Sequence, residues 1–141
     1  MNTKEQAFDL VNKTCEYYKI ELTQLQRNHK SSTHKICVNK EGQIVRLSEI
    51  RMALSYFLYK YCPITLTEIT PLVGYKDHTT MSSYRKVIEH YIRMEDINFF
   101  PYYLKIIDLA SDCGIRMDVE RISTKANRMM FRNLKGFVVS L

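Results

Sequence analysis

Residues 65–80, TLTEITPLVGYKDHTT, decide how this chain folds. Thr65 and Glu68 have the spacing of a capping box, in which each side chain serves the other residue's backbone N–H, so a helix is expected directly after Thr65. Gly74 is a natural stop for this helix, because glycine adopts the left-handed conformation that ends helices. Pro71 lies inside the expected helix and should kink or shorten it.

The residues after Gly74 predict a second helix, joined to the first by a tight turn. Asp77 is a natural N-cap, and Met81, Tyr84 and Ile88 follow with the three- and four-residue spacing of a helix. This is a helix-turn-helix pattern, in which the start of the second helix can meet base edges in the major groove of DNA. Helical hairpins that bind nothing share this spacing, so spacing alone does not separate the two interpretations.

Apolar spacing elsewhere in the chain predicts further helices and one hairpin. The expected elements are a helix with its stripe from Ala7 to Tyr18, a short helix at 22–26, a β-hairpin at about 35–46, helices at 48–61, about 66–73 and from Asp77 through Ile92, a helix opening at Asp96 and ended by Gly114, and a basic helix at 117–133. The expected fold class is therefore mainly α, a helix-turn-helix bundle of about six helices with a small hairpin and a C-terminal helical extension.

Glycine spacing excludes two large classes of enzyme. The chain has 141 residues, the size of one domain, and only four glycines. No pair of these glycines has the spacing of a phosphate-binding loop or of a dinucleotide-binding turn, both of which need paired glycines to bring backbone N–H groups against phosphates. We therefore expect no nucleotide and no cofactor.

The positive charge is concentrated in two blocks. The formal net charge is +6, and residues 27–51 and 115–141 each carry six basic and two acidic side chains. An excess of basic residues favours polyanionic partners, but it does not distinguish nucleic acid from a membrane surface or an acidic protein. The block at 115–141 is either a solvated helix, a second phosphate-binding surface or a docking segment for a homodimer or another protein.

The cysteines and the first residues predict a cytoplasmic protein. The four cysteines form no C-x-x-C pair, and MNTKEQAFDL at the start has no apolar signal segment. No run approaches 18 apolar residues, so no membrane span is expected. His34 and Cys37 stand three residues apart, but nothing nearby is spaced to complete a metal site, so none is expected.

Residues 74–80, GYKDHTT, resemble the G-G-R-D-H-T-T motif in the C-terminal DNA-binding domain of the bacterial replication initiator DnaA. The flanking LTEI at 66–69 and YRKV at 84–87 resemble that family's L-P-E-I and A-C-R-K-I. EYYKI at 16–20 and the stretch from Arg46 to Leu54 are similar to further family segments, in the same order. The resemblance implies a Trp-repressor-like helix-turn-helix domain at 1–113 and a basic extension at 114–141.

The resemblance also implies which residues contact DNA. Asp77, His78 and Thr79 would approach bases in the major groove, and Lys76 and Thr80 would hold the adjacent backbone. The complete expected set is Arg46, Thr67, Tyr75, Lys76, Asp77, His78, Thr79, Thr80, Arg85 and Lys86. Tyr75 replaces a family glycine and is expected to stack or hydrogen-bond at the DNA surface.

The chain departs from the family pattern in two further places that bear on this site. The hairpin replaces a short arginine-rich loop, which leaves Lys35, Lys40 and Arg46 as candidates for a minor-groove contact and the hairpin as a candidate wing. One residue is missing between Thr80 and the Arg85–Lys86 pair, so the register of this pair against the family is open.

The leading prediction is a sequence-preferring double-stranded DNA-binding protein, acting in transcription or replication control, on a mobile element or phage, without an ATPase module. The alternative is a helical protein–protein interaction module that uses the same scaffold and the basic tail. An enzyme is not expected, because Asp77 and His78 have no linked nucleophile. The two main predictions differ in whether Arg46, Lys76 and Lys86 share one face with His78.

Overall fold

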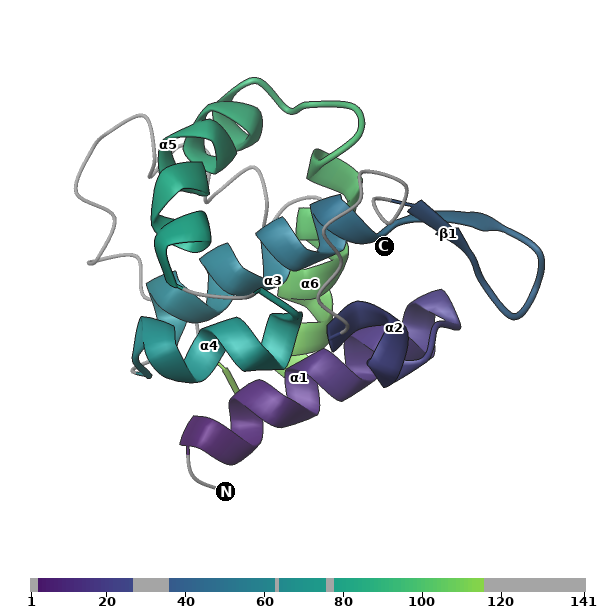
Figure 1. Cartoon of the computed structure of the whole chain (residues 1–141), viewed down its shortest axis with the longest axis horizontal. Helices are drawn as coiled ribbons and strands as arrows, with labels where there is room; N and C mark the ends of the chain where they lie inside the picture. Colours follow the sequence, from purple (N-terminus) through teal and green to yellow (C-terminus); the bar gives the residue numbers. More distant parts are fainter. Residues whose placement is uncertain (1–2, 27–35, 63, 76–77, 116–141) are drawn as a thin grey trace.

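The computed structural model describes four stretches of the chain: 3–26, 36–62, 64–75 and 78–115. Within the last stretch, residues 78–81 are described by their backbone alone. In these stretches it contains six helices and one two-stranded hairpin, which confirms the predicted mainly α fold (Figure 1). The elements are α1 (Thr3–Tyr18), α2 (Leu22–Gln26), β1 (Ile36–Val38), β2 (Ile44–Arg46), α3 (Leu47–Tyr61), α4 (Leu66–Val73), α5 (His78–Arg93) and α6 (Phe100–Asp112). The helix predicted at 117–133 lies outside the described residues.

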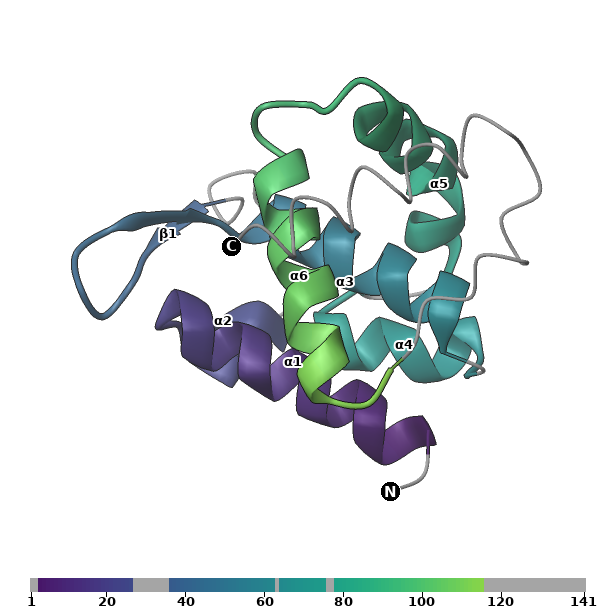
Figure 2. The same cartoon turned by 180° about the vertical axis from the view of Figure 1, so that it is seen from behind.

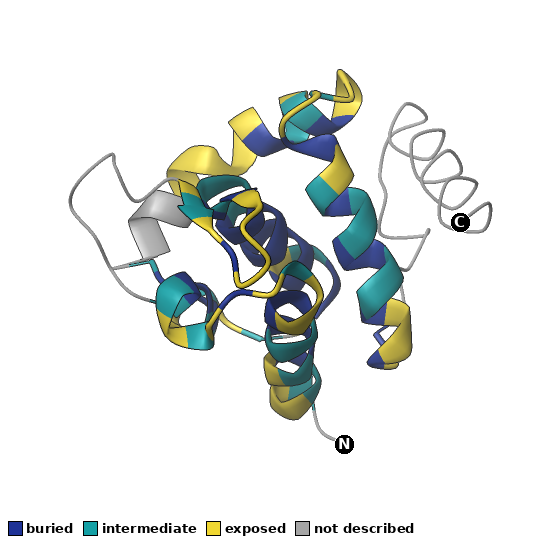
Figure 3. Cartoon of the chain, turned by 90° about the vertical axis from the view of Figure 1, so that its right-hand side faces the viewer, coloured by how far each residue is buried: buried dark blue, intermediate teal, exposed yellow. Residues whose placement is uncertain are grey.

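Helix α3 forms the centre of the core. Ile50, Leu54, Phe57 and Leu58 are fully buried, since their three- and four-residue spacing turns them toward the packed sides of the helix. Helices α4, α5 and α6 all contact α3, and they surround it in two opposite views (Figures 1 and 2). Buried residues gather on the inward sides of the helices (Figure 3). From α6, the Tyr103 ring lies 6.5 Å from the Phe57 ring.

The hairpin is attached to the end of α1. Its strands are antiparallel, with Val38 opposite Ile44, and Gly42 supplies the left-handed turn residue with φ 78°. Asn39 is buried, and its side-chain amide donates to the Tyr18 carbonyl oxygen at 2.9 Å. A two-stranded hairpin is only marginally stable by itself, so this attachment positions the strands against the helical body.

Helix α4 has the predicted limits and the predicted cap. The Thr65 hydroxyl oxygen accepts the Glu68 backbone N–H at 3.2 Å and lies 3.1 Å from the Glu68 carboxylate. Pro71 removes one helical N–H donor, yet α4 continues for two residues beyond it. The Thr67 carbonyl, left without that donor, accepts the Thr70 hydroxyl at 3.4 Å instead.

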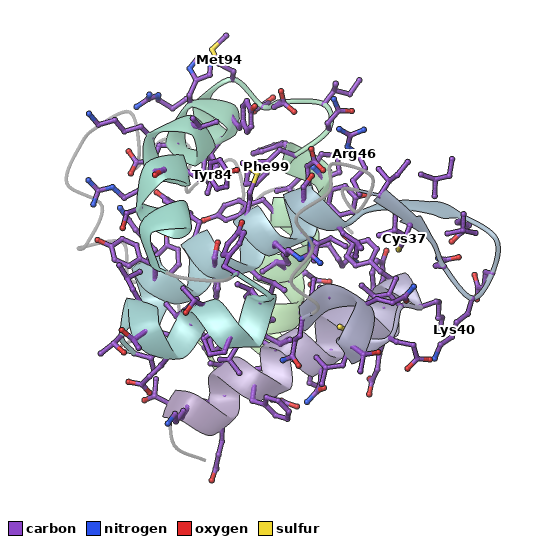
Figure 4. The ribbon with its side chains drawn as sticks, viewed as in Figure 1. Cys37, Lys40, Arg46, Tyr84, Met94 and Phe99 are labelled. Carbon is purple, nitrogen blue, oxygen red and sulfur yellow. The ribbon has the colours of Figure 1, made fainter. Side chains whose placement is uncertain are left out.

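The start of α6 corrects the sequence prediction. A helix was expected to open at Asp96, but α6 begins at Phe100. The Asp96 carboxylate accepts the backbone N–H groups of Asn98 and Phe99 at 2.9 and 3.0 Å, which closes a turn before the helix. This turn places the fully buried Phe99 in the core (Figure 4). Burial of that ring stabilises the fold more than four further helical residues would.

Candidate nucleic-acid interface

Helices α4 and α5 are joined by a short connection that begins at Gly74. Gly74 has left-handed backbone geometry with φ 89°, and its N–H donates to the Thr70 carbonyl at 3.1 Å. The N–H of Tyr75 donates to the same carbonyl at 3.0 Å. Helix α5 begins at His78, so three residues separate Gly74 from it, and the two helices contact each other. This is the arrangement that the helix-turn-helix prediction requires.

Two of the three predicted base-reading residues, His78 and Thr79, lie at the start of α5. The backbone of His78, Thr79 and Thr80 forms the first turn of the helix. Lys76 and Asp77, and with them the predicted cap, lie outside the described residues. The first N–H groups of a helix have no acceptor within it, and together with the helix dipole they favour anions such as phosphate.

Helix α5 has one buried side and one exposed side. Ile88 and Ile92 are buried, 1% and 2% exposed, and anchor the helix to the core. Lys86, His90 and Arg93 are exposed. A helix turns about 100° per residue, so Lys86 lies on the side opposite Ile88 and in line with the backbone position of Thr79. The exposed side thus continues from the predicted base-reading turn into a row of basic side chains.

Arg85 is directed differently from its neighbour Lys86. Its Nη1 atom donates to the Tyr59 hydroxyl of α3 at 3.3 Å, and its Nε atom lies 3.9 Å from the Glu89 carboxylate. The bond to Tyr59 is the main reason why the pKa of Arg85 is raised. Arg85 therefore spans the flank between α5 and α3. Of the two basic residues with an open register, Lys86 occupies the outward position.

Tyr75 corrects the sequence prediction, which expected it at the DNA surface. Its side chain packs against the core, its hydroxyl oxygen is buried, and its ring lies 6.3 Å from the Tyr84 ring. Burial, the largest cause, raises the pKa of Tyr75 despite Ser55 nearby. Tyr75 therefore acts as a packing residue beneath the connection between α4 and α5.

Arg46 lies apart from α5, at the N-terminal end of α3. Its backbone N–H donates to the Tyr102 hydroxyl of α6 at 3.0 Å, and its guanidinium bonds Glu49 at 3.1 Å, which raises its pKa. Figure 4 shows Arg46 near the hairpin and Tyr84 on α5, well separated. Tyr59, the α3 partner of Arg85, lies about 20 Å from Arg46 along α3, because an α-helix rises about 1.5 Å per residue. Arg46 therefore lies far from Arg85 and from the start of α5.

Of the other basic candidates near the hairpin, Lys40 is among the described residues. Lys40, in the hairpin turn, forms an ion pair with Glu21 at 2.8 Å, and both side chains are largely exposed. Its backbone N–H donates to the Lys19 carbonyl at 3.0 Å, so the turn is fixed to the segment after α1. Lys35 lies outside the described residues. The hairpin therefore presents Lys40 as an exposed but paired cation.

Thr67 is exposed in the first turn of α4, at the end of the helix away from Gly74. It lines an open cavity between α4 and α1 rather than the side where α5 lies. Two further exposed basic residues of α5, His90 and Arg93, did not enter the predicted site. Their spacing of four and seven residues from Lys86 was the signal that could have found them.

In the part of the chain that the structure describes, no group of three or more His, Cys, Asp or Glu side chains is placed to hold a metal ion. All four cysteines are free thiols. None of the described helices is long and apolar enough to cross a lipid bilayer. Compared with known proteins, the chain matches no protein-family model, no curated protein and no solved structure.

Proposed function

We propose that this chain is a cytoplasmic, sequence-preferring double-stranded DNA-binding protein that uses α4 and α5 as a helix-turn-helix and catalyses no reaction. One observation carries the proposal. Helix α5 follows α4 after a four-residue connection, and its exposed side runs from the Thr79 position to Lys86, His90 and Arg93. The likeness of residues 74–80 to the DnaA motif supports the same assignment.

This side of α5 has residues suited to base contacts in its first turn and a residue suited to a phosphate contact further along. The major groove admits one helix, whose first turn meets base edges. Asp77 can accept from an exocyclic amine, and His78 can donate to a base or approach it. Lys86 lies about two turns further along, where a cation neutralises a phosphate and contributes affinity without sequence information.

Salt dependence tests the proposed role of Lys86. Removal of one phosphate contact lowers the slope of log affinity against log salt by about one. Binding to a random duplex pool should be measured at several salt concentrations for the wild type, for Lys86→Ala and for Lys13→Ala. Lys13 is on α1, across the molecule from α5 (Figures 1 and 2), so its variant removes the same charge elsewhere.

The expected result is a reduced slope for Lys86→Ala and a smaller change for Lys13→Ala. Equal slopes in the two variants would show that general charge, not α5, supplies the affinity. Selection of bound duplexes from a random library supplies the second half of the test. A motif that wild type enriches and His78→Ala loses supports base reading, and the same selected pool for both proteins contradicts it.

A protein-interaction module is the second candidate, and the hairpin favours it. Ile36, Val38 and Ile44 are 50%, 63% and 70% exposed on one face of the strands. Exposed apolar groups that lie together are typical of protein contacts. The separation of Arg46 from the start of α5 also fits this candidate better than a single DNA-binding surface. A wild-type protein that lacks measurable duplex affinity at low salt would leave this candidate in place.

A further inference from the structure

An open groove lies between α1 and α4, on the side of α4 that does not contact α5. It has a volume of about 890 Å³, and its walls include Glu5, Phe8, Asp9, Glu68, Pro71 and Leu72. This volume falls in the range of pockets that hold ligands or short peptide segments. We refer to it as the α1–α4 groove. Figures 1 and 2 show its two helices side by side.

The groove combines an apolar floor with an acidic rim. Phe8 is 44% exposed, an unusual position for a phenylalanine, and Pro71 is exposed opposite it on α4. Of the charged residues that line the groove, three are acidic and one, Lys4, is basic and lies 3.6 Å from Glu68. The groove thus has a net charge of −2, and it suits a segment that offers apolar side chains between basic ones.

The described chain ends beside this groove. After α6, the Cys113 and Gly114 carbonyl oxygens both lie 3.4 Å from the Gln6 side-chain nitrogen of α1. Burial and a hydrogen bond to the Asp9 carboxylate raise the pKa of the Cys113 thiol to about 12. Asp9 also lines the groove, so the described chain ends within side-chain reach of the groove wall. Figure 2 shows these last described residues beside α1 and α4.

The sequence beyond residue 115 has the composition that the groove requires. Residues 116–141 carry six basic and two acidic side chains. Within them, residues 128–132 read Arg-Met-Met-Phe-Arg, three large apolar side chains flanked by two arginines. Twelve residues separate this stretch from Ile115, enough at about 3.3 Å per residue to reach any part of the groove. Met adapts readily to irregular apolar surfaces.

We propose that residues 128–132 of this chain dock in the α1–α4 groove of the same molecule. Phe131 and the two methionines would cover Phe8 and Pro71, and Arg128 and Arg132 would face the acidic rim. The connection is intramolecular, so its effective concentration is in the millimolar range and modest contacts suffice. The groove residue Thr67 would then be covered by the docked segment.

Zero-length carbodiimide coupling of the full-length protein tests this docking, since it joins a lysine amine to a carboxylate only where the two meet. Lys125 and Lys135 flank the docking stretch. An equal mixture of light and isotope-labelled protein separates coupling within one molecule from coupling between two. The expected products join Lys125 or Lys135 to Glu5, Asp9 or Glu68, each product carrying a single isotope.

Variants on both sides of the contact make the test specific. Phe131→Ser and Phe8→Ser should each lower the groove products by up to about tenfold, the loss expected for one partly buried aromatic ring. Tyr17→Ser is the matched control, because Tyr17 is a similarly exposed ring on α1, 49% exposed, that does not line the groove. Thermal unfolding confirms that each variant is folded.

Four outcomes would overturn the proposal. Products spread evenly over all acidic residues would show that the segment has no fixed site. Products at Glu89 or Glu95 would place it against or beyond α5. Products that combine both isotopes would assign the groove to the tail of a second copy. Groove products that are unaffected by Phe8→Ser would also contradict the apolar contact.

Discussion

The α-carbon of Gly74 lies directly against the backbone of Leu25, so closely that a β-carbon at position 74 would overlap the Leu25 carbonyl oxygen. The same oxygen accepts a hydrogen bond from Nε of Arg51 at 2.8 Å. Arg51 is only 9% exposed and also donates to the Gln24 carbonyl at 3.1 Å. The glycine that begins the connection between α4 and α5 is therefore packed against α2, and an arginine of α3 holds that part of α2 in place.

Gly74→Ala should strongly destabilise the protein. The left-handed conformation costs about 1–2 kcal/mol for a residue with a β-carbon, and the forced overlap with backbone adds about 1–3 kcal/mol. Gly42→Ala is the matched control, since Gly42 has a similar φ but no atom within 4 Å of an added β-carbon. Urea unfolding should give about 1–2 kcal/mol for the control and clearly more for Gly74→Ala. Equal losses would mean that the contact with Leu25 has no energetic weight.

The sequence predicted well the helix ends that depend on residues close together in the chain. The Thr65–Glu68 cap and the stop at Gly74 depend on residues within one turn of each other, and both are confirmed. The start of α6 depends on a distant cause. Asp96 is a good cap in any sequence, but the chain turns there because Phe99 has to reach the core. No spacing rule applied to the residues near Asp96 contains that information.

In the candidate site, too, the positions set by local spacing could be predicted, and those set by packing between distant segments could not. The position of Lys86 on the outward side of α5 follows from helical spacing once Ile88 is known to be buried. The inward position of Tyr75 could not be inferred, because a residue between two helices is usually exposed and its burial results from packing against α3 and Tyr84. The pairing of Arg85 with Tyr59 likewise joins two helices that are distant in sequence.

The inward position of Tyr75 leads to a prediction that separates packing from DNA contact. Tyr75→Phe should leave duplex affinity within about twofold of wild type, because the hydroxyl is buried and does not reach solvent. Tyr75→Ala should cost about 2–4 kcal/mol of stability through the cavity that it creates. Fluorescence anisotropy with a duplex and urea unfolding measure the two effects. A tenfold loss of affinity in the stable Phe variant would restore Tyr75 to the DNA surface.

Cys15 should make the protein less stable in alkaline solution. Burial, and to a smaller degree Glu21 and Glu16, raise the pKa of this thiol from 9.0 to about 11. The unfolded chain therefore loses the Cys15 proton from about pH 9, whereas the folded protein keeps it until about pH 11. The contribution is complete below pH 9 and is lost as the pH rises toward 11, by up to about 1.4 kcal/mol per pH unit.

Urea unfolding between pH 8 and pH 11 under reducing conditions, at steps of about half a unit, measures this effect. Each protein is compared with its own stability at neutral pH, which removes the cost of the substitution itself. Cys15→Ala should show a shallower alkaline decline than wild type. Cys37→Ala, which removes a partly exposed strand thiol, should follow wild type more closely. Identical declines in all three proteins would assign the alkaline loss to other buried groups, such as the Cys62 and Cys113 thiols and the buried tyrosines.

Docking of residues 128–132 in the α1–α4 groove should weaken DNA binding, a prediction that rests on the proposed function. If residues 128–132 occupy the groove, they hold two arginines against acidic residues instead of phosphates. Phe8→Ser should release them without changing the net charge, and raise duplex affinity by up to about tenfold at low salt. Tyr17→Ser should leave affinity unchanged. Loss of the groove cross-links in Phe8→Ser without a gain in affinity would keep the docking and reject its effect on DNA binding, whereas intact cross-links would reject the docking contact itself.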